Sequence, residues 1–354
     1  MEENEKRRPI TVGVAGIGGW GKNLARNFDE LPDADLRYVC DVDPGRLGQA
    51  RRQHPTAQAT PEFGRLLEDP ELEAIVIATI GSTHHTLCKA ALEAGKDVFV
   101  EKPFALKSSD AEELVRIAQE RNRILMVGHL LEYHPVIERL RQMIVGNELG
   151  RMYYIYSQRL NLGTVRHDEN ALWNFAPHDI SSIMYMLGRR PTDVSARGQS
   201  YLQRGIEDVV FMTLNFGDEA MANVHVSWLD PHKTRRITLV GSQKMAVFDD
   251  GEATEKLRIY DKGAHVNTDY NSFAEFVGLR FGDITLPYIK SGEPLRVECL
   301  HFLDCVRRRA RPRSDGWDGL AVVRVLEAAE QSLKRRGEPV HLTWEDDPAG
   351  APAA

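Results

Sequence analysis

Residues 10–21 read ITVGVAGIGGWG, and the organisation of the chain follows from them. An apolar run leads directly into Gly16, Gly18 and Gly21, which have G-x-G-x-x-G spacing. In a strand-turn-helix unit the first glycine makes the tight turn, the second lets the backbone approach a pyrophosphate, and the third lets the helix pack on the strand. The phosphates bind at the helix N-terminus, where unpaired N–H groups and the helix dipole favour negative charge. The stretch therefore predicts a dinucleotide-binding unit.

A second predicted strand, 36–40, ends in Asp41, twenty residues after Gly21. An acidic side chain at this place accepts hydrogen bonds from the ribose hydroxyls of adenosine. The alternative is that Asp41 is a turn residue before Asp43-Pro44 and that the glycines form a flexible loop. Strand, glycines, helix and acid together favour cofactor binding. The carboxylate would also repel a ribose 2′-phosphate, so the sequence favours NAD over NADP.

The chain has 354 residues, which suits two domains. Its 45 Lys and Arg against 52 Asp and Glu give a net charge of -7, which argues against a nucleic-acid partner. The four cysteines show no C-x-x-C spacing and are too few for a disulfide framework. No apolar run approaches the roughly 20 residues that a membrane helix needs. We therefore expect a cytoplasmic protein with a small-molecule substrate, no membrane association and no nucleic-acid partner.

Strand-like and helix-like segments alternate after Asp41, as in a doubly wound parallel sheet. The apolar runs 74–79, 97–100 and 124–127 are typical of strands. Segment 83–94, between the first two, is typical of a helix. The tripeptide Glu101-Lys102-Pro103 follows the second run directly. Ligands of such sheets bind beyond the carboxyl ends of the strands, so this tripeptide lies where chemistry is expected. The pattern predicts an α/β, NAD-binding Rossmann domain over residues 8–130.

From Arg151 onward the chain becomes rich in β-type runs with hairpin-type glycines between neighbours. The predicted strands are 152–160, 208–216, 220–228, 235–240 and 244–248, and the predicted helices are 177–187, 298–309 and 317–335. We therefore expect a C-terminal α+β domain, residues 131–345, with a large, mostly antiparallel sheet that is solvated or self-associating on one face. Residues 346–354 are expected to be a flexible tail.

The chain resembles, along almost its whole length, the glucose-fructose oxidoreductase and inositol dehydrogenase family (Gfo/Idh/MocA). The segments that carry the resemblance are GIGGWG, VCDVDP, HHTLCKAALEAGKDVFVEKP, APHD and SDGWDGLAVVRVLEAA. The family implies a Rossmann domain and a C-terminal domain whose sheet covers the site and often forms an oligomer interface. A homodimer or homotetramer is therefore expected. The resemblance also implies that Glu101, Lys102 and Pro103 form the family's EKP element and that His178 is its catalytic histidine.

Longer segments such as HLLEYHP and RLNLGTVRHDENALWNFAPHDIS are most similar to nucleotide-sugar 3-dehydrogenases, of the kind that oxidise UDP-N-acetylglucosamine.

One position departs from the family pattern. Many members have an aspartate four residues before the histidine, and this chain has Asn174 there. An amide can position a hydroxyl but cannot act as a base. The sequence leaves open whether Asn174 or Asp179 assists His178.

Oxidation of a secondary alcohol requires a base that removes the hydroxyl proton. His178, predicted at the start of a helix, has an ordinary pKa of about 6.5, and a helix N-terminus would favour its neutral form. The alternative is a histidine that caps the helix. Lys102 would hydrogen-bond the developing alkoxide, the alternative being a solvated surface lysine. A cis bond at Pro103 would aim Lys102, although only about 5% of such bonds are cis.

The remaining candidates are weighed against ordinary structural roles. The His84-His85 and His129/His134 pairs lack the i, i+4 spacing of helical metal ligands, so no metal is expected. His129 and Tyr133 would contact the sugar or the nicotinamide ribose. The forks of Arg166, Arg235 and Arg236 would suit a diphosphate, the alternative being surface salt bridges.

Two sets of site residues result. The predicted cofactor contacts are Gly16, Gly18, Gly19, Trp20, Gly21, Asp41, Thr79, Glu101, Lys102 and His129. The predicted substrate contacts are Lys102, Tyr133, Asn161, Arg166, Asn174, His178 and Arg235, of which Lys102, Asn174 and His178 are catalytic. The predicted function is NAD-dependent oxidation of a secondary hydroxyl, the 3-hydroxyl, of a nucleotide-linked sugar such as UDP-N-acetylglucosamine. The alternatives are a free sugar or cyclitol as substrate, or a catalytically silent NAD-binding regulatory protein.

Overall fold

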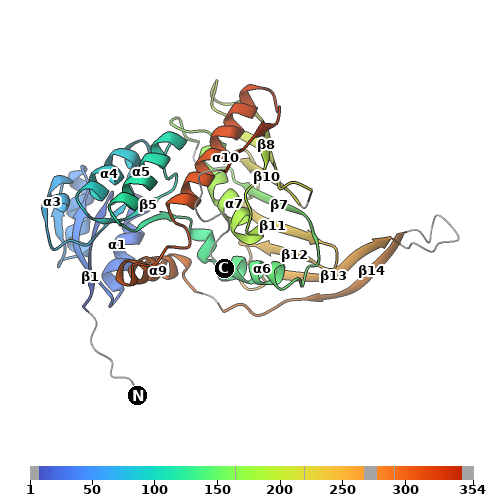
Figure 1. The fold of residues 1–354 in the computed structure, drawn as a ribbon, viewed down its shortest axis with the longest axis horizontal. Helices are drawn as coiled ribbons and strands as arrows, with labels where there is room; N and C mark the ends of the chain where they lie inside the picture. The colour runs from blue at the N-terminus through green and yellow to red at the C-terminus, as the bar shows by residue number, and fades with distance from the viewer. Residues whose placement is uncertain (1–7, 164, 219, 267–276, 291, 345–354) are drawn as a thin grey trace, which may run out of the picture. The chain divides into compact units, whose positions relative to one another are not determined.

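The computed structural model describes residues 8–163, 165–218, 220–266, 277–290 and 292–344 (Figure 1). The chain divides into two compact units that do not follow sequence order. Unit 1 consists of Met1–Tyr133 and Gly292–Val323, and unit 2 of His134–Ser291 and Arg324–Ala354. The expected domain limits, 8–130 and 131–345, do follow sequence order and stay a prediction. The expected tail, 346–354, lies outside the described residues.

Unit 1 contains a six-stranded parallel sheet in the order β3-β2-β1-β4-β5-β6. Its strands are β1 (Ile10–Ala15), β2 (Ala34–Cys40), β3 (Gln58–Thr60), β4 (Ala74–Ile77), β5 (Asp97–Glu101) and β6 (Leu125–Gly128). The helices between them are α1 (Gly21–Glu30), α2 (Pro44–Gln53), α3 (Gly64–Glu68), α4 (Gly81–Glu93) and α5 (Ser108–Glu120). This strand order is that of the dinucleotide-binding Rossmann fold. The predicted α/β class of this part of the chain is confirmed.

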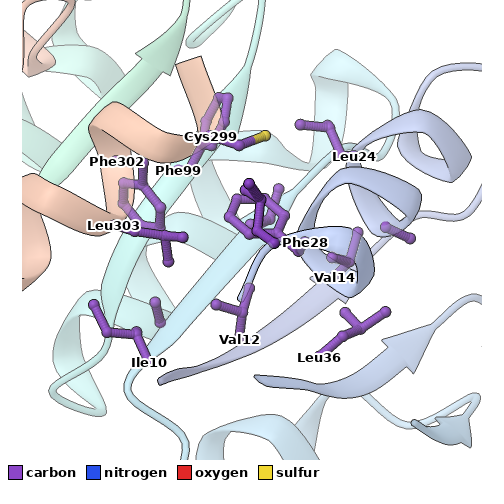
Figure 2. Close-up of a cluster of buried hydrophobic side chains, with 14 of the residues drawn as sticks. Ile10, Val12, Val14, Leu24, Phe28, Leu36, Phe99, Cys299, Phe302 and Leu303 are labelled. Carbon is purple, nitrogen blue, oxygen red and sulfur yellow. The ribbon is translucent and has the colours of Figure 1, made fainter. Parts of the chain in front are cut away.

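A helix from the C-terminal third of the chain, α9 (Pro294–Arg308), completes the core of unit 1. Its Phe302 ring lies 6.4 Å from that of Phe28 on α1 and 5.6 Å from that of Phe99 on β5. Figure 2 shows these rings gathered over β1 together with Cys299 and Leu303 of α9. Complete burial of such a side chain contributes roughly 1.5 to 3 kcal/mol. The sheet therefore depends on a segment that is more than 200 residues away along the chain from four of its strands, β1 to β4.

Unit 2 contains a nine-stranded sheet in the order β14-β13-β12-β11-β7-β10-β9-β8-β15. Its strands are β7 (Met152–Leu160), β8 (Asp193–Gln199), β9 (Val209–Asn215), β10 (Met221–Ser227), β11 (Thr234–Gly241), β12 (Met245–Asp249), β13 (Leu257–Val266), β14 (Val277–Thr285) and β15 (Val340–His341). Among the described pairs, β7 and β10 are parallel and the others are antiparallel. The predicted large, mostly antiparallel sheet is confirmed.

The helices of unit 2 include α6 (Pro135–Val145) and α7 (Ala171–Leu187), while α10 (Gly316–Lys334) contains the boundary between the units. The sequence predicted that helix α7 begins at Pro177, but it begins at Ala171. The Asn170 side chain caps it by accepting a hydrogen bond from the Trp173 N–H at 3.1 Å. Gly188 ends it in a left-handed conformation. Within the described part of the chain, no helix is long and apolar enough to cross a membrane.

Candidate active site

The loop from Gly16 to Gly21, here called the cofactor loop, joins β1 to α1. Gly16 has a positive φ of 89°, and a Cβ built on it would lie 2.6 Å from the Ala78 carbonyl group. A Cβ at Gly21 would lie 1.7 Å from the Gly16 carbonyl oxygen, whereas a Cβ at Gly19 would meet nothing within 4 Å. No side chain caps the N-terminus of α1. The loop therefore has the close backbone approaches and the open helix end that a dinucleotide pyrophosphate requires.

Asp41 is buried at the carboxyl end of β2 and holds the cofactor loop. Its Oδ2 accepts the Ile17 N–H at 2.8 Å, and its Oδ1 accepts the Asp43 N–H at 2.9 Å. Arg46 Nη1 lies 3.5 Å from the same Oδ2 and also close to Gly18. A carboxylate has about four lone-pair sites, so these contacts leave capacity for ribose hydroxyls. Arg46 was not among the predicted residues, and it adds a positive charge beside the adenosine position.

Residues Glu101–Pro103 are here called the EKP segment. Its first residue, Glu101, contacts the cofactor loop. Trp20 Nε1 donates to Glu101 Oε1 at 2.6 Å, and the Lys102 N–H donates to Oε2 at 3.2 Å. A Cβ at Gly128 would lie 3.0 Å from the carboxylate, so a larger residue there would displace Glu101. Burial raises the pKa of Glu101 to about 7, although the Lys102 charge and the Trp20 hydrogen bond favour the ionised form. Glu101 is thus a buried carboxyl that titrates near neutrality.

The peptide bond between Lys102 and Pro103 is cis, as considered from the sequence. Lys102 is half-buried at the end of β5. Thr79 follows the neighbouring strand β4, and its Oγ1 lies 2.7 Å from that of Thr83. His129 is buried after β6. The predicted cofactor residues therefore come together at the carboxyl ends of adjacent parallel strands.

Glu298, on α9 in the core of unit 1, was not predicted. It is fully buried, and neither carboxylate oxygen has a hydrogen-bond partner among the described residues. Burial and the repulsion of Glu101 and Glu132 raise the pKa of Glu298 well above its ordinary value. An uncompensated buried charge is costly, so this burial favours the protonated, neutral form of Glu298. In the sequence Glu298 is an acidic residue in a predicted helix, and no motif or spacing indicates that it is buried.

In unit 2, Asn174 and His178 lie one helical turn apart on the same face of α7, and both are partly buried. Because α7 begins at Ala171, His178 lies well inside the helix. The expectation that His178 is at the helix start is wrong, and so is the alternative that it caps the helix. The N-terminal dipole acts mainly within the first turn, so it does not account for a neutral His178.

The orientation of the Asn174 amide follows from its partners. Its Nδ2 donates to Glu169 Oε1 at 2.6 Å, and its Oδ1 accepts from Trp228 Nε1 at 3.3 Å. A carboxylate only accepts and an indole N–H only donates, so the two contacts permit one amide orientation. Glu169 therefore puts a carboxylate beside the position where many family members have aspartate. The sequence did not single out Glu169 for this role, nor Trp228.

Asp179 points away from the face that holds His178 and is engaged by strand β7. Ser157 Oγ donates to its Oδ1 at 2.6 Å, and Arg159 Nε donates to its Oδ2 at 2.7 Å. Asp179 is almost fully buried, so this ion pair is shielded from water. Its two carboxylate oxygens are both used in holding α7 to the sheet.

The other predicted substrate residues differ in how far they remain open to a ligand. Arg166 is already paired, with Nη2 2.7 Å from Asp168 Oδ2 and Nε 2.7 Å from Glu169 Oε1. Arg235 is exposed, and its Nη1 lies 3.6 Å from Asp250 Oδ2. Asn161 begins the loop after β7, and its N–H donates to Ser227 O at 3.1 Å.

Tyr133 belongs to unit 1, where it has a packing role. It is 4% exposed, its hydroxyl lies 3.1 Å from Ser314 Oγ, and the Arg313 guanidinium lies over its ring. This burial does not support the predicted contact with a sugar. Among the described residues there is no group of three or more His, Cys, Asp or Glu side chains that could hold a metal.

Two models of known protein families match the chain. The model described as "Oxidoreductase family, NAD-binding Rossmann fold" matches residues 10–129, and the model of the GFO/IDH/MocA C-terminal domain matches residues 137–247. The chain belongs to the Gfo/Idh/MocA family. It is an NAD-binding oxidoreductase. NAD fits the cofactor loop because no side chain caps the N-terminus of α1 and a Cβ at Gly19 would meet nothing within 4 Å, which leaves the backbone N–H groups open to a pyrophosphate.

Several Gfo/Idh/MocA proteins are similar over most of the chain. The UDP-N-acetylglucosamine 3-dehydrogenase of Acidithiobacillus ferrooxidans is 29% identical over 324 residues, which is 91% of this chain and 96% of the relative. A solved structure of that enzyme has a TM-score of 0.79 at 24% identity and covers 93% of this chain and 99% of its own. Inositol 2-dehydrogenase 2 of Paenarthrobacter aurescens is 30% identical over 229 residues, 62% of this chain and 68% of the relative.

Proposed function

We propose that the protein is an NAD-dependent dehydrogenase that oxidises the 3-hydroxyl of a nucleotide-linked amino sugar, with UDP-N-acetylglucosamine as the representative substrate. The observation that carries the proposal is the similarity to the Acidithiobacillus enzyme over 91% of this chain. The proposal also requires a base and an alkoxide-stabilising group in a family site. His178 and Lys102 supply these residue types at the positions that the resemblance implies.

In this proposal His178 accepts the hydroxyl proton, and the Lys102 ammonium hydrogen-bonds the oxygen as negative charge develops on it. Asn174 orients the hydroxyl or the imidazole, because Glu169 and Trp228 hold its amide in one orientation, and it takes no proton, because an amide is not a base. Glu101 joins the EKP segment to the cofactor loop. When bound, NAD supplies the acceptor for the hydride that leaves the oxidised carbon.

A diphosphate would need cationic partners, and the proposal assigns Arg166 and Arg235 to it. Arg235 is exposed and only loosely associated with Asp250, so it can turn toward an anion. Arg166 must first exchange the carboxylates of Asp168 and Glu169 for phosphate oxygens. Such an exchange preserves charge-assisted hydrogen bonding, but it removes Arg166 from Glu169, whose carboxylate also accepts from Asn174. Substrate binding would in this way be coupled to the residue beside His178.

A free cyclitol or sugar is the second candidate substrate. Its support is the 30% identity to the Paenarthrobacter inositol 2-dehydrogenase 2, together with the internal pairing of Arg166. An uncharged substrate would not need Arg166 to leave its carboxylates.

We also propose that the protein forms a homodimer or homotetramer in the cytoplasm through the outward face of the unit 2 sheet. Three large side chains on neighbouring strands of that face are between 43% and 50% exposed: Tyr154, Phe211 and Met221. Met221 pairs with Tyr154 across β7 and β10, and Phe211 lies farther along the same face, where its ring stacks on that of His225. Exposed apolar side chains of this kind are typical of surfaces that interfaces cover. The four free cysteines are compatible with a reducing compartment.

The test is turnover of a panel that contains UDP-N-acetylglucosamine, other nucleotide sugars, glucose and myo-inositol, with UDP as a competitor. We expect the highest kcat/KM for a nucleotide sugar, competitive inhibition by UDP, and weaker inhibition in Arg166→Ala. Arg258→Ala is a matched control, because Arg258 is likewise paired with two carboxylates, Glu252 and Glu255, but is not assigned to the site. Higher kcat/KM for inositol or glucose, with no competition by UDP, would transfer the proposal to the second candidate.

A further inference from the structure

His84 and His85 are consecutive residues of α4 with opposite surroundings. His84 is 1% exposed, and its Nδ1 lies 2.7 Å from the Pro103 carbonyl oxygen and its Nε2 3.2 Å from the Thr79 carbonyl oxygen. His85 is partly exposed, and its Nε2 lies 2.7 Å from Glu113 Oε2 on α5. The His84-His85 pair is therefore split between a buried contact with backbone carbonyls and a surface contact with a carboxylate.

The two carbonyls beside His84 belong to the segments that follow β4 and β5. These strands are parallel neighbours, with Ile77 in register with Val100. Asp41 follows β2, on the other side of β1, and marks the adenosine half of a dinucleotide site. The nicotinamide half then lies on the β4 side. His84 bridges the two chain segments closest to that half, one of which holds Lys102.

The chemistry of the ring decides which contact is a hydrogen bond. A neutral imidazole has one donor and one acceptor, whereas both neighbours are carbonyl oxygens that can only accept. Burial lowers the pKa of His84 and outweighs the two carbonyl contacts, which raise it, and the nearby Lys102 charge lowers it as well, so the neutral ring is favoured at pH 7. The shorter contact assigns the proton to Nδ1. The Thr79 carbonyl then faces the Nε2 lone pair and receives no hydrogen bond from the ring.

The Pro103 carbonyl accepts the hydrogen bond from His84 Nδ1. Proline has no N–H, so its carbonyl is the only backbone group with which Pro103 can form a hydrogen bond. Gly81, one turn before His84 on the same face of α4, packs under the proline ring, since a Cβ there would lie 3.1 Å from Pro103 Cγ. The first turn of α4 therefore contacts Pro103 at both its ring and its carbonyl.

We infer that His84 is a positioning residue: its Nδ1–H holds the Pro103 carbonyl and thereby the backbone that aims Lys102 at the reacting hydroxyl. This inference rests on the role of Lys102 in the proposed function. A displacement of about 1 Å at a reacting group can reduce a rate by roughly 100-fold, so loss of this single hydrogen bond affects turnover more than folding. The binding of the adenosine half is independent of it.

Two amide substitutions separate this role from a merely structural one. In His84→Asn the amide nitrogen can occupy the position of Nδ1, and in His84→Gln it can occupy that of Nε2. We expect His84→Asn to keep kcat within about 3-fold and His84→Gln to lose at least about 10-fold, a range set by the sensitivity of catalysis to positioning. His85→Gln, on the same helix, is the control and should leave kcat unchanged. Equal losses in both His84 variants would overturn the inference.

Two readouts do not depend on turnover. Nitrogen-15 NMR of the imidazoles in the wild-type protein should show His84 as the neutral Nδ1–H tautomer at pH 7 to 8, and the Nε2–H tautomer in that range would overturn the inference. The ratio of NAD affinity to ADP-ribose affinity should fall in His84→Gln only, with ADP-ribose binding unchanged. If the wild-type protein oxidises no sugar, the proposed function fails, and these two readouts still decide whether His84 holds the segment.

Discussion

Replacement of Asn174 by aspartate would restore the residue that many family members have, and the structure predicts that it is harmful here. Asn174 Nδ2 donates to Glu169 Oε1 at 2.6 Å. In Asn174→Asp two carboxylates would face each other at that separation. Coulomb's law with an effective dielectric constant of about 20 gives roughly 6 kcal/mol of repulsion.

Several effects reduce that value. Glu169 is 20% exposed and its Oε1 lies 2.7 Å from Arg166 Nε, so water and a positive charge screen it. Both side chains can also rotate. We therefore expect Asn174→Asp to lower the free energy of unfolding by roughly 2 kcal/mol at pH 7. The loss should shrink toward pH 4, where one of the two carboxylates takes up a proton.

A double-mutant cycle with urea unfolding tests this contact. Glu169→Gln alone keeps an acceptor oxygen for Asn174 and should cost less than about 1 kcal/mol. In the double variant N174D/E169Q the glutamine amide donates to the new aspartate, so stability should return to within about 1 kcal/mol of the wild-type protein. Additive effects of the two substitutions, or a stable Asn174→Asp variant at pH 7, would refute the contact and the amide orientation derived from it.

Three further predictions follow from single side chains. His178→Ala should lower kcat by roughly 100-fold or more with NAD affinity nearly unchanged, and near-normal turnover would remove His178 from the proposed site. Asp41→Ser should raise the affinity for NADP relative to NAD by about 10-fold, because it removes the carboxylate that repels a 2′-phosphate and leaves Arg46 beside that position. Calorimetry with both cofactors measures this ratio, and an unchanged or lower ratio would contradict the role of Asp41. Glu101 has its folded-state pKa raised to about 7, so its contribution to stability is present below its ordinary pKa of about 4.5 and is lost as pH rises through 7. Unfolding free energies of Glu101→Gln should therefore fall less between pH 5 and 8 than those of the wild-type protein, and parallel curves would contradict the raised pKa.

The Rossmann sheet could be predicted because its signals are local. The glycines of the cofactor loop, the acid after β2 and the apolar strands each follow from a few neighbouring residues. Helix α9 has a pattern of its own, but nothing in it shows that Phe302 packs against Phe28 and Phe99. That contact depends on tertiary packing between segments far apart in the chain, which periodicity does not report.

The start of α7 shows a different limit. The apolar spacing predicts a helix over 177–187, whereas the Asn170 cap lies seven residues before Pro177. The loop before it contains many polar residues, and the sequence could not show which of them acts as the cap. Strands β8, β13 and β14 also went unpredicted, because their glycines and charged residues interrupt the alternation on which a strand prediction depends.

For the candidate site, the residue types on the cofactor side were foreseeable, and their partners were not. Asp41, Glu101 and Lys102 stand in recognisable motifs. Glu298 and Trp228 stand in none of the quoted motifs, and each gains its importance from a side chain that is distant in sequence. Glu169 lies in the quoted segment 159–181, but the sequence did not show that its carboxylate accepts from Asn174. Arg166 was selected for its charge alone, and the two carboxylates that already pair with it became visible only in the structure.

The central claim is oxidation at carbon 3 of a nucleotide-linked amino sugar, and transfer of an isotope tests it most directly. UDP-N-acetylglucosamine deuterated at carbon 3 is incubated with the protein and NAD, and the reduced cofactor is analysed by mass spectrometry. The account predicts deuterated NADH, formed with the wild-type protein and at least about 100-fold more slowly with His178→Ala. Unlabelled NADH would contradict oxidation at carbon 3, and the absence of any reduced cofactor, with myo-inositol oxidised under the same conditions, would contradict the substrate class.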